Sequence, residues 1–121
     1  MSLLSQRDHE DRPWGSFDRF TLNEFSTVKI ISLQPLQKLS LQTHTKRSEC
    51  WHIIAGSGDV IIDGTVHPAK AGDDFEIAIG AAHRAIASAE GLTFLEIALG
   101  TFDEHDEVRL EDAYGRGSPT S

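Results

Sequence analysis

The fold is decided by the stretch Trp51-His52-Ile53-Ile54-Ala55-Gly56-Ser57-Gly58-Asp59-Val60-Ile61-Ile62-Asp63-Gly64. Its two apolar runs lie on either side of a glycine-rich turn signal and have the length and composition of β-strands. Asp63-Gly64 predicts a tight hairpin after the second run, because both residues tolerate positive φ. The stretch therefore predicts strand, turn, strand and hairpin in that order.

The same pattern of short strands and turns continues on both sides of this stretch. Lys38 to His44 alternates apolar and polar residues, which is the period of a half-buried strand. Helix signals are almost absent. Further strand-like runs occupy residues 26–33, 65–68, 75–79, 83–87 and 91–100. Short strands at such regular spacing, punctuated by glycine, predict an all-β sandwich or barrel.

The composition fixes the broad class of the protein. At 121 residues the chain has the size of one domain with its own core. Its hydrophobic content of 39% and charged content of 25% are ordinary for a soluble globular protein. The formal charge of −8 argues against nucleic acid as a partner and against an anionic membrane surface, since both need a basic face. An acidic chain still binds a phosphorylated sugar where a few arginines converge.

The chain ends and the single cysteine point to a compartment. The N-terminus becomes charged too early for a secretory signal, and no apolar run approaches the roughly 20 residues of a membrane span. Cys50 is the only cysteine, which excludes an internal disulfide and suits a reducing compartment. We therefore expect a cytoplasmic protein. We also expect flexible ends at residues 1–10 and 117–121, a domain at 11–116, and Trp14 pinning the N-terminal end onto that domain.

Several residues have the chemistry of metal ligands. His44 and Lys46 are two apart and face the same side if the strand continues, Glu49 follows a bend, and His83 comes just after Gly80. Two imidazoles and a carboxylate are enough to hold a catalytic metal with open positions for water or substrate. A histidine beside a glycine turn is more often a satisfied structural residue, so this cluster alone is a modest signal. Cys50 should point away from it and act as a small buried hydrophobe.

The order of these residues resembles the two cupin motifs: His44-x-Lys46-x-x-Glu49, then Gly56, then Gly72 and Gly80-x-x-His83. The chain further resembles the cupin domain of type II mannose-6-phosphate isomerases, from about Arg12 to Arg116. That closer resemblance lies in Arg12-Pro13-Trp14-Gly15, Arg47-x-Glu49-x-Trp51, and Val108-Arg109-Leu110-Glu111-Asp112-x-Tyr114-Gly115-Arg116. It implies an all-β, single-domain cupin, an antiparallel jelly-roll β-barrel.

The resemblance also implies a function, the metal-assisted aldose–ketose isomerisation of a sugar phosphate such as mannose 6-phosphate. Such a reaction needs a positive group at the developing oxyanion, a base that moves the proton, and arginines on the phosphate. The divalent ion would be zinc, iron, manganese or nickel. The implied residues are His44, Glu49 and His83 as metal ligands, Arg47, Arg109 and Arg116 for the sugar phosphate, and Glu96 as the base. Lys46, which does not match the family, is a second catalytic candidate.

One departure from the family puts this function in question. Where the family usually reads His-His-His-Arg-Ala-Glu-His-Trp, this chain reads His44-Thr45-Lys46-Arg47-Ser48-Glu49-Cys50-Trp51. Lys46 stands at an expected ligand position, and a protonated ammonium repels a metal. Either burial neutralises Lys46, or its charge replaces the metal and pairs with Glu49. The second case predicts a noncatalytic sugar- or small-acid-binding cupin. A metal-dependent cupin acting on an unrelated substrate is a third hypothesis.

An apolar strand near the N-terminus predicts association. Val28-Lys29-Ile30-Ile31 would expose apolar side chains and unpaired backbone groups if it formed a sheet edge. We therefore expect a homodimer that pairs through this strand.

Overall fold

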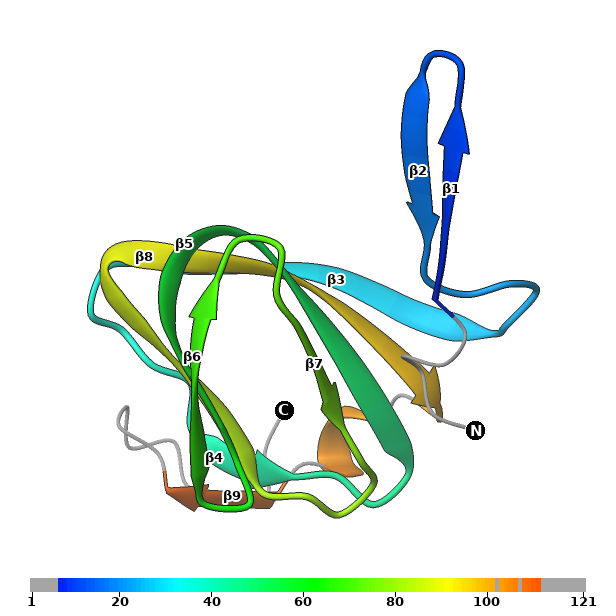
Figure 1. Ribbon diagram of the computed structural model, residues 1–121. Helices are drawn as coiled ribbons and strands as arrows, with labels where there is room; N and C mark the ends of the chain where they lie inside the picture. The colour runs from blue at the N-terminus through cyan, green and yellow to red at the C-terminus, as the bar shows by residue number, and fades with distance from the viewer. Residues whose placement is uncertain (1–6, 102, 107, 112–121) are drawn as a thin grey trace.

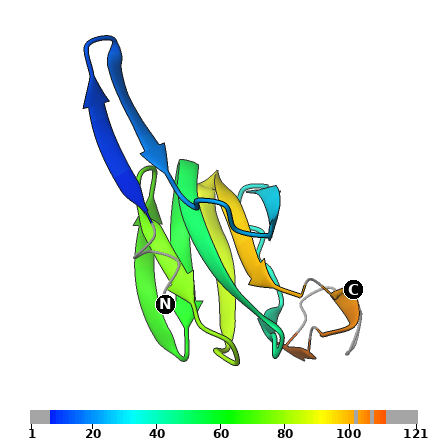
Figure 2. The same cartoon turned by 90° about the vertical axis from the view of Figure 1, so that its right-hand side faces the viewer.

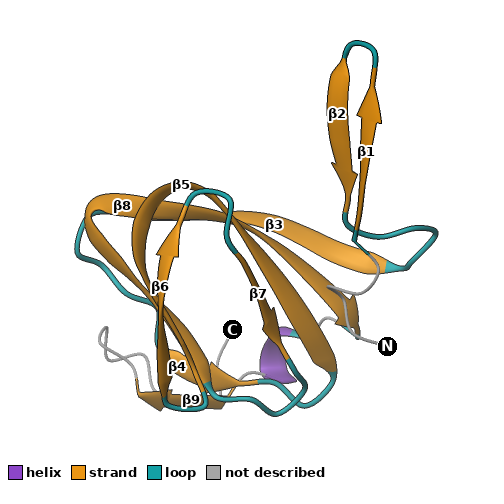
Figure 3. Cartoon of the chain, viewed as in Figure 1, coloured by secondary structure: helices purple, strands orange, loops and turns teal. Residues whose placement is uncertain are grey.

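The structure is a computed structural model that describes residues 7–101, 103–106 and 108–111, with only the backbone described for Glu104, Arg109 and Glu111. Strands dominate it (Figure 3). In chain order the elements are β1 (Asp8–Arg12), β2 (Gly15–Arg19), β3 (Ser26–Leu33), β4 (Leu41–Thr43), β5 (Arg47–Ile62), β6 (Thr65–Lys70), β7 (Asp74–Ile77), β8 (His83–Gly100), the 3-10 helix η2 (Glu104–Asp106) and β9 (Val108–Glu111). The all-β prediction is confirmed.

Two long bent strands, β5 and β8, lie at the centre of the sheet. They pair antiparallel from Arg47↔Gly100 to Ile62↔His83. β6 and β7 pair with β5, whereas β3 and β4 pair with β8, and β9 extends the sheet beyond β4. The sheet curves around a core in the manner of a jelly roll (Figure 1). The predicted antiparallel jelly-roll topology is therefore confirmed, but the described strands do not close into the predicted barrel.

Gly56 does not end a strand as the sequence predicted, whereas Gly64 turns the chain as expected. Gly56 was expected to end a strand, but β5 continues through it with a register shift. Its φ is +77°, and a Cβ there would lie 2.1 Å from the carbonyl oxygen of Gly91. The close approach bends both strands without breaking their pairing. The long strands β5 and β8 therefore each take the place of two short strands predicted from the sequence. Asp63 and Gly64 do form the predicted hairpin, with φ of 48° and 83°.

Inward-facing side chains of the bent sheet form the main core. Trp51, Ile53 and Phe94 are almost completely buried, and the rings of Trp51 and Phe94 lie 4.5 Å apart. Residues of β5 alternate, so Cys50 points away from this core into a second cluster with Ile97. Cys50 is a buried free cysteine, as predicted.

The N-terminal hairpin of β1 and β2 is a separate two-stranded sheet that projects from the body (Figures 1 and 2). Trp14 lies in its turn with 72% of its surface exposed, so the expectation that it pins the chain end is wrong. The hairpin turns tightly between Arg12 and Gly15, which carries Trp14 away from the curved sheet. Asp8 to Glu10, expected to be flexible, lie in β1, whereas residues 1–6 and 117–121 lie outside the described residues.

No helix in the described part of the chain has the length and apolar character needed to cross a membrane.

Candidate metal-binding site

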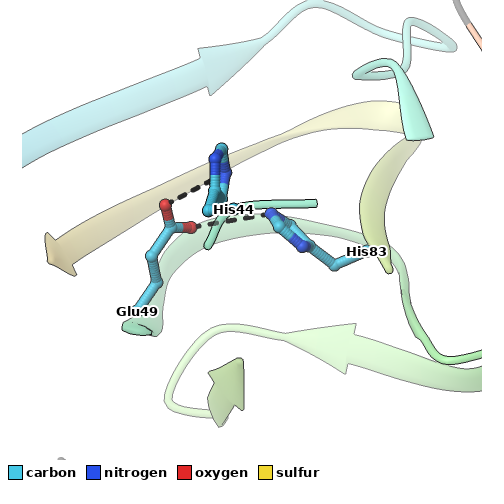
Figure 4. Close-up of side chains that lie close together, drawn as sticks. All are labelled: His44, Glu49 and His83. Atoms are coloured by element: carbon cyan, nitrogen blue, oxygen red, sulfur yellow. Dashed lines mark ion pairs between the residues drawn. The ribbon is translucent and has the colours of Figure 1, made fainter. Parts of the chain in front are cut away.

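His44, Glu49 and His83 meet inside the curved sheet (Figure 4). His44 follows the end of β4, Glu49 is on β5, and His83 begins β8. Pairing of Gln42 on β4 with His83 brings the two histidines together. The ligand atoms of the three residues all lie within 4.8 Å of one another, and each side chain is at most 3% exposed. The three expected ligands are therefore brought to one point.

Glu49 lies between the two imidazoles. Its Oε2 is 3.4 Å from Nε2 of His44, and its Oε1 is 3.8 Å from Nε2 of His83. Burial alone would raise the pKa of Glu49, but the charges that His83 and His44 carry when protonated at low pH, together with the hydrogen bond from Arg47, outweigh burial and lower it. Glu49 is thus held as a carboxylate, the form that binds cations.

His83 is oriented as a metal ligand would be. Its Nδ1 lies 2.9 Å from the carbonyl oxygen of Ala81, so Nδ1–H donates to that oxygen and the lone pair of Nε2 faces Glu49. Burial lowers the pKa of His83, which keeps the ring neutral. Metal-bound histidines usually donate their second ring nitrogen to a carbonyl or carboxylate in this way. This donor therefore fits a divalent metal.

His44 has a different environment. Its Nε2 accepts a hydrogen bond from Nη2 of Arg47 at 3.2 Å, because a guanidinium has only donors. The proton of the neutral ring is then on Nδ1, which is buried with no hydrogen-bond partner among the described residues. Burial lowers the pKa of His44 to about 4. The lone pair that a metal needs is therefore present but engaged by Arg47.

Arg47 lies within the cluster itself, although the sequence assigned it to the sugar phosphate. It is 5% exposed, and its Nε donates to Oε2 of Glu49 at 2.9 Å. Its Nη1 approaches the backbone oxygen of Asp103 at 3.4 Å. The guanidinium thus contacts two of the three metal-ligand candidates.

Lys46 is not in the site, which corrects both sequence expectations for it. Its side chain is 52% exposed, and its Nζ lies 3.2 Å from Asp103, not beside Glu49. The cause is Asp106 of η2, whose carboxylate accepts the backbone N–H groups of Thr45 and Lys46 at 3.0 and 2.8 Å and also the Thr45 hydroxyl. These bonds bend the chain after β4, so the strand alternation that would align Lys46 with His44 is lost.

Glu96 is beside the cluster, as the sequence suggested. It is 6% exposed on β8, opposite Trp51, and is hydrogen-bonded to Glu49. Burial and the charge of Glu49 raise the pKa of Glu96 to about 8. Since two adjacent buried carboxylates do not both ionise, Glu96 holds the shared proton near neutral pH. It is a carboxyl group that can donate and accept a proton.

Two further contributors were not assigned from the sequence. Nε1 of Trp51 donates to Oε1 of Glu49 at 3.0 Å, and Asp106 fixes the loop that carries His44. The i, i+2 spacing of Arg47, Glu49 and Trp51 on one strand was the available signal for Trp51. Arg109 pairs with Gln42 through its backbone, but its side chain is not described, and Arg116 lies outside the described residues.

The curved sheet and its buried histidine–carboxylate cluster define a cupin. A solved cupin protein from Bacteroides fragilis matches this structure with a TM-score of 0.58 and 26% identity, over 63% of this chain and 66% of that one. The profile of the family described as mannose-6-phosphate isomerase C-terminal matches residues 2–112, and the chain belongs to this family.

Two relatives place the family in carbohydrate metabolism. The chain is 36% identical over 107 residues to mannose-1-phosphate guanylyltransferase ManC of Salmonella typhimurium, covering 87% of this chain and 22% of that protein. It is 34% identical over 110 residues to the alginate biosynthesis protein AlgA of Pseudomonas fluorescens, covering 89% and 23%. The chain thus spans under a quarter of the length of either relative. Neither name mentions isomerisation, so the isomerase function stays a prediction.

Proposed function

We propose that this cupin domain binds a divalent metal and a sugar phosphate and acts in aldose–ketose isomerisation. The observation that supports this most is the convergence of His44, Glu49 and His83 within 4.8 Å. The donor set suits a metal because Glu49 is ionised, both rings are neutral, and His83 is already oriented. A bound metal would supply electrophilic stabilisation of an ene-diolate oxygen. Zinc, iron, manganese and nickel all suit such donors.

Glu96 is the residue of this chain that would move the proton. The reaction removes a proton from the carbon beside the carbonyl and returns one to the neighbouring carbon. A carboxyl group with a pKa raised to about 8 is a stronger base, once ionised, than an ordinary glutamate. Its burial excludes the solvent that would otherwise exchange the proton. Lys46, exposed and paired with Asp103, has no part in this step.

The test combines metal content with turnover. Protein prepared without chelator should contain close to one metal per chain by elemental analysis, and His83→Ala should lose it. The same protein should convert mannose 6-phosphate to fructose 6-phosphate. Glu96→Gln should abolish conversion while retaining the metal, and Glu90→Gln, an exposed control, should change neither. Wild-type protein without metal and without turnover would contradict the proposal.

The contacts of Arg47 favour a second candidate function, a noncatalytic sugar- or small-acid-binding cupin. In that case an internal cation stands in for the metal, as the sequence suggested, but the cation is Arg47 in place of Lys46. Calorimetry in the presence of chelator separates the two functions. Binding of mannose 6-phosphate in chelator, with no conversion when metal is supplied, supports the second candidate and contradicts the first.

A further inference from the structure

Arg47 and a metal ion require the same atoms. The guanidinium donates to Nε2 of His44 and to Oε2 of Glu49, at 3.2 and 2.9 Å. An imidazole nitrogen has one lone pair, so Nε2 of His44 accepts from Arg47 or coordinates a metal, but does not do both. The other ring nitrogen of His44 carries the proton and has no partner among the described residues. Metal binding therefore requires Arg47 to leave His44.

The charges of the cluster lead to the same conclusion. The two side chains with fixed opposite charges here are Arg47 and Glu49, and they balance each other within a site that is at most 5% exposed. A divalent ion added beside them would leave two uncompensated positive charges in a region with little solvent, which is strongly unfavourable. Movement of the guanidinium out of the cluster reduces this excess, and so does the arrival of an anion that pairs with it. A phosphate group is such an anion, because a guanidinium binds phosphate through two parallel hydrogen bonds.

We propose that Arg47 is a built-in counter-cation that competes with the metal for His44 and Glu49, so that metal and anion bind to this site cooperatively. The inference rests on the proposed function, since it concerns the same metal and the same phosphorylated substrate. In the absence of metal, Arg47 neutralises Glu49 and keeps the cluster folded. An anion that draws Arg47 away frees His44 and Glu49, and by linkage the metal raises the affinity for the anion by the same factor.

This role differs from that of an ordinary residue around a metal site. Removing a side chain that supports a ligand weakens metal binding, whereas removing a competitor strengthens it. The sign of the effect of Arg47→Gln therefore separates the two roles. Lys46→Gln is a matched control, because it removes one positive charge from the neighbouring residue without touching the cluster.

The experiment measures Mn²⁺ affinity, by electron paramagnetic resonance of free Mn²⁺, with and without inorganic phosphate. We expect Arg47→Gln to bind Mn²⁺ at least about tenfold more tightly than wild type without phosphate, within the usual range of coupling between sites. Phosphate should tighten binding to wild type and to Lys46→Gln, and should have little effect on Arg47→Gln. The last protein also controls for complexation of Mn²⁺ by phosphate in solution. His83→Ala should bind in neither condition, which locates the ion.

The outcomes separate this inference from the proposed function. Tight binding to wild type, lost in His83→Ala but unchanged or weakened in Arg47→Gln, would leave the metal site established and overturn the competition. Absence of binding in every protein would overturn both.

A second measurement needs no variant and applies if Arg47→Gln fails to fold. The side-chain Nε–H of Arg47 is buried and hydrogen-bonded to Glu49, so it should give a slowly exchanging nitrogen-15 NMR signal. Stoichiometric Zn²⁺ should remove that protection. An unchanged Arg47 signal in the zinc-loaded protein would contradict the competition.

Discussion

The cluster around Glu49 buries polar side chains, whereas the N-terminal segment exposes apolar ones. The cluster holds His44, Arg47, Glu49, His83 and Glu96 inside the sheet, each at most 6% exposed. In the segment from Trp14 to Ile30, by contrast, large apolar side chains face solvent, among them Phe25 at 92% and Ile30 at 66%. Of the eleven exposed large apolar side chains in the described part of the chain, five lie in this segment from Trp14 to Ile30.

The two regions differ in what they need to be stable. Buried charges cost free energy unless they are paired and hydrogen-bonded, and in the cluster each charged group has such a partner. Exposed apolar groups cost nothing by themselves, but they favour association when several lie in one segment. The first region is therefore complete within one chain, whereas the homodimer expected from the sequence would cover the second. Four substitutions test this contrast.

The largest effect should come from Glu49→Ala. It removes the acceptor of Arg47 and Trp51 and leaves a guanidinium buried without its carboxylate. Removing one partner of a buried ion pair typically costs about 3–5 kcal/mol. Urea denaturation of the metal-free protein should show a loss of that size in the free energy of unfolding. Glu90→Ala, at an exposed position, should stay within about 0.5 kcal/mol of wild type. Equal losses in both variants would mean that the cluster is not paired as described.

Asp106→Ala should have the next largest effect. Burial alone would raise the pKa of Asp106, but its hydrogen bonds from Thr45 and Lys46 lower it, so the group is a carboxylate that holds the loop before β5. Removing it leaves two backbone donors without their acceptor, at a cost of about 1–3 kcal/mol. Lys46→Ala keeps those backbone groups and loses only an exposed ion pair, worth about 0–1 kcal/mol. Denaturation curves of the two variants that coincide would contradict the anchoring role.

Features set by local sequence were predictable, whereas features set by contacts between distant residues were not. Strand periodicity and hairpin chemistry are local, so the all-β fold and the Asp63-Gly64 turn were predictable. The positions of His44, Glu49 and His83 came from the order of motifs and were brought together as expected. The orientation of Lys46 was not predictable from alternation, because Asp106, 60 residues later, reshapes its loop. Continuous pairing through Gly56 depends equally on a distant partner, Gly91.

Glu96→Gln should change how stability depends on pH. Glu96 has a folded-state pKa raised from 4.5 to about 8, so folding favours its protonated form. Its contribution is fully present below the unfolded-state pKa and is lost as pH rises through about 8. The stability of wild type relative to Glu96→Gln should therefore fall between pH 5 and 8, by at most about 1.4 kcal/mol per pH unit.

Comparing the two proteins isolates Glu96 from the other shifted groups. The lowered pKa values of His44, His83 and Glu49 act in the opposite direction but are present in both proteins. Urea denaturation in chelator at several pH values measures the difference. Parallel curves would show that Glu96 does not hold the shared proton.

The smallest effect on folding, and the sharpest test of the contrast, is expected from Val28→Glu on β3. Val28 and Val66 are each 56% exposed, on β3 and β6 respectively, so Val66→Glu is a matched control for added charge. Val66→Glu should unfold within about 0.5 kcal/mol of wild type, and so should Val28→Glu at protein concentrations where wild type is monomeric. If a homodimer pairs through β3, a buried carboxylate at its interface should dissociate it in Val28→Glu only. Sedimentation velocity should then show dimers for wild type and Val66→Glu and monomers for Val28→Glu. A wild-type protein that stays monomeric at every concentration would contradict the homodimer. The exposed apolar segment would then be stable without a partner, as the buried cluster is.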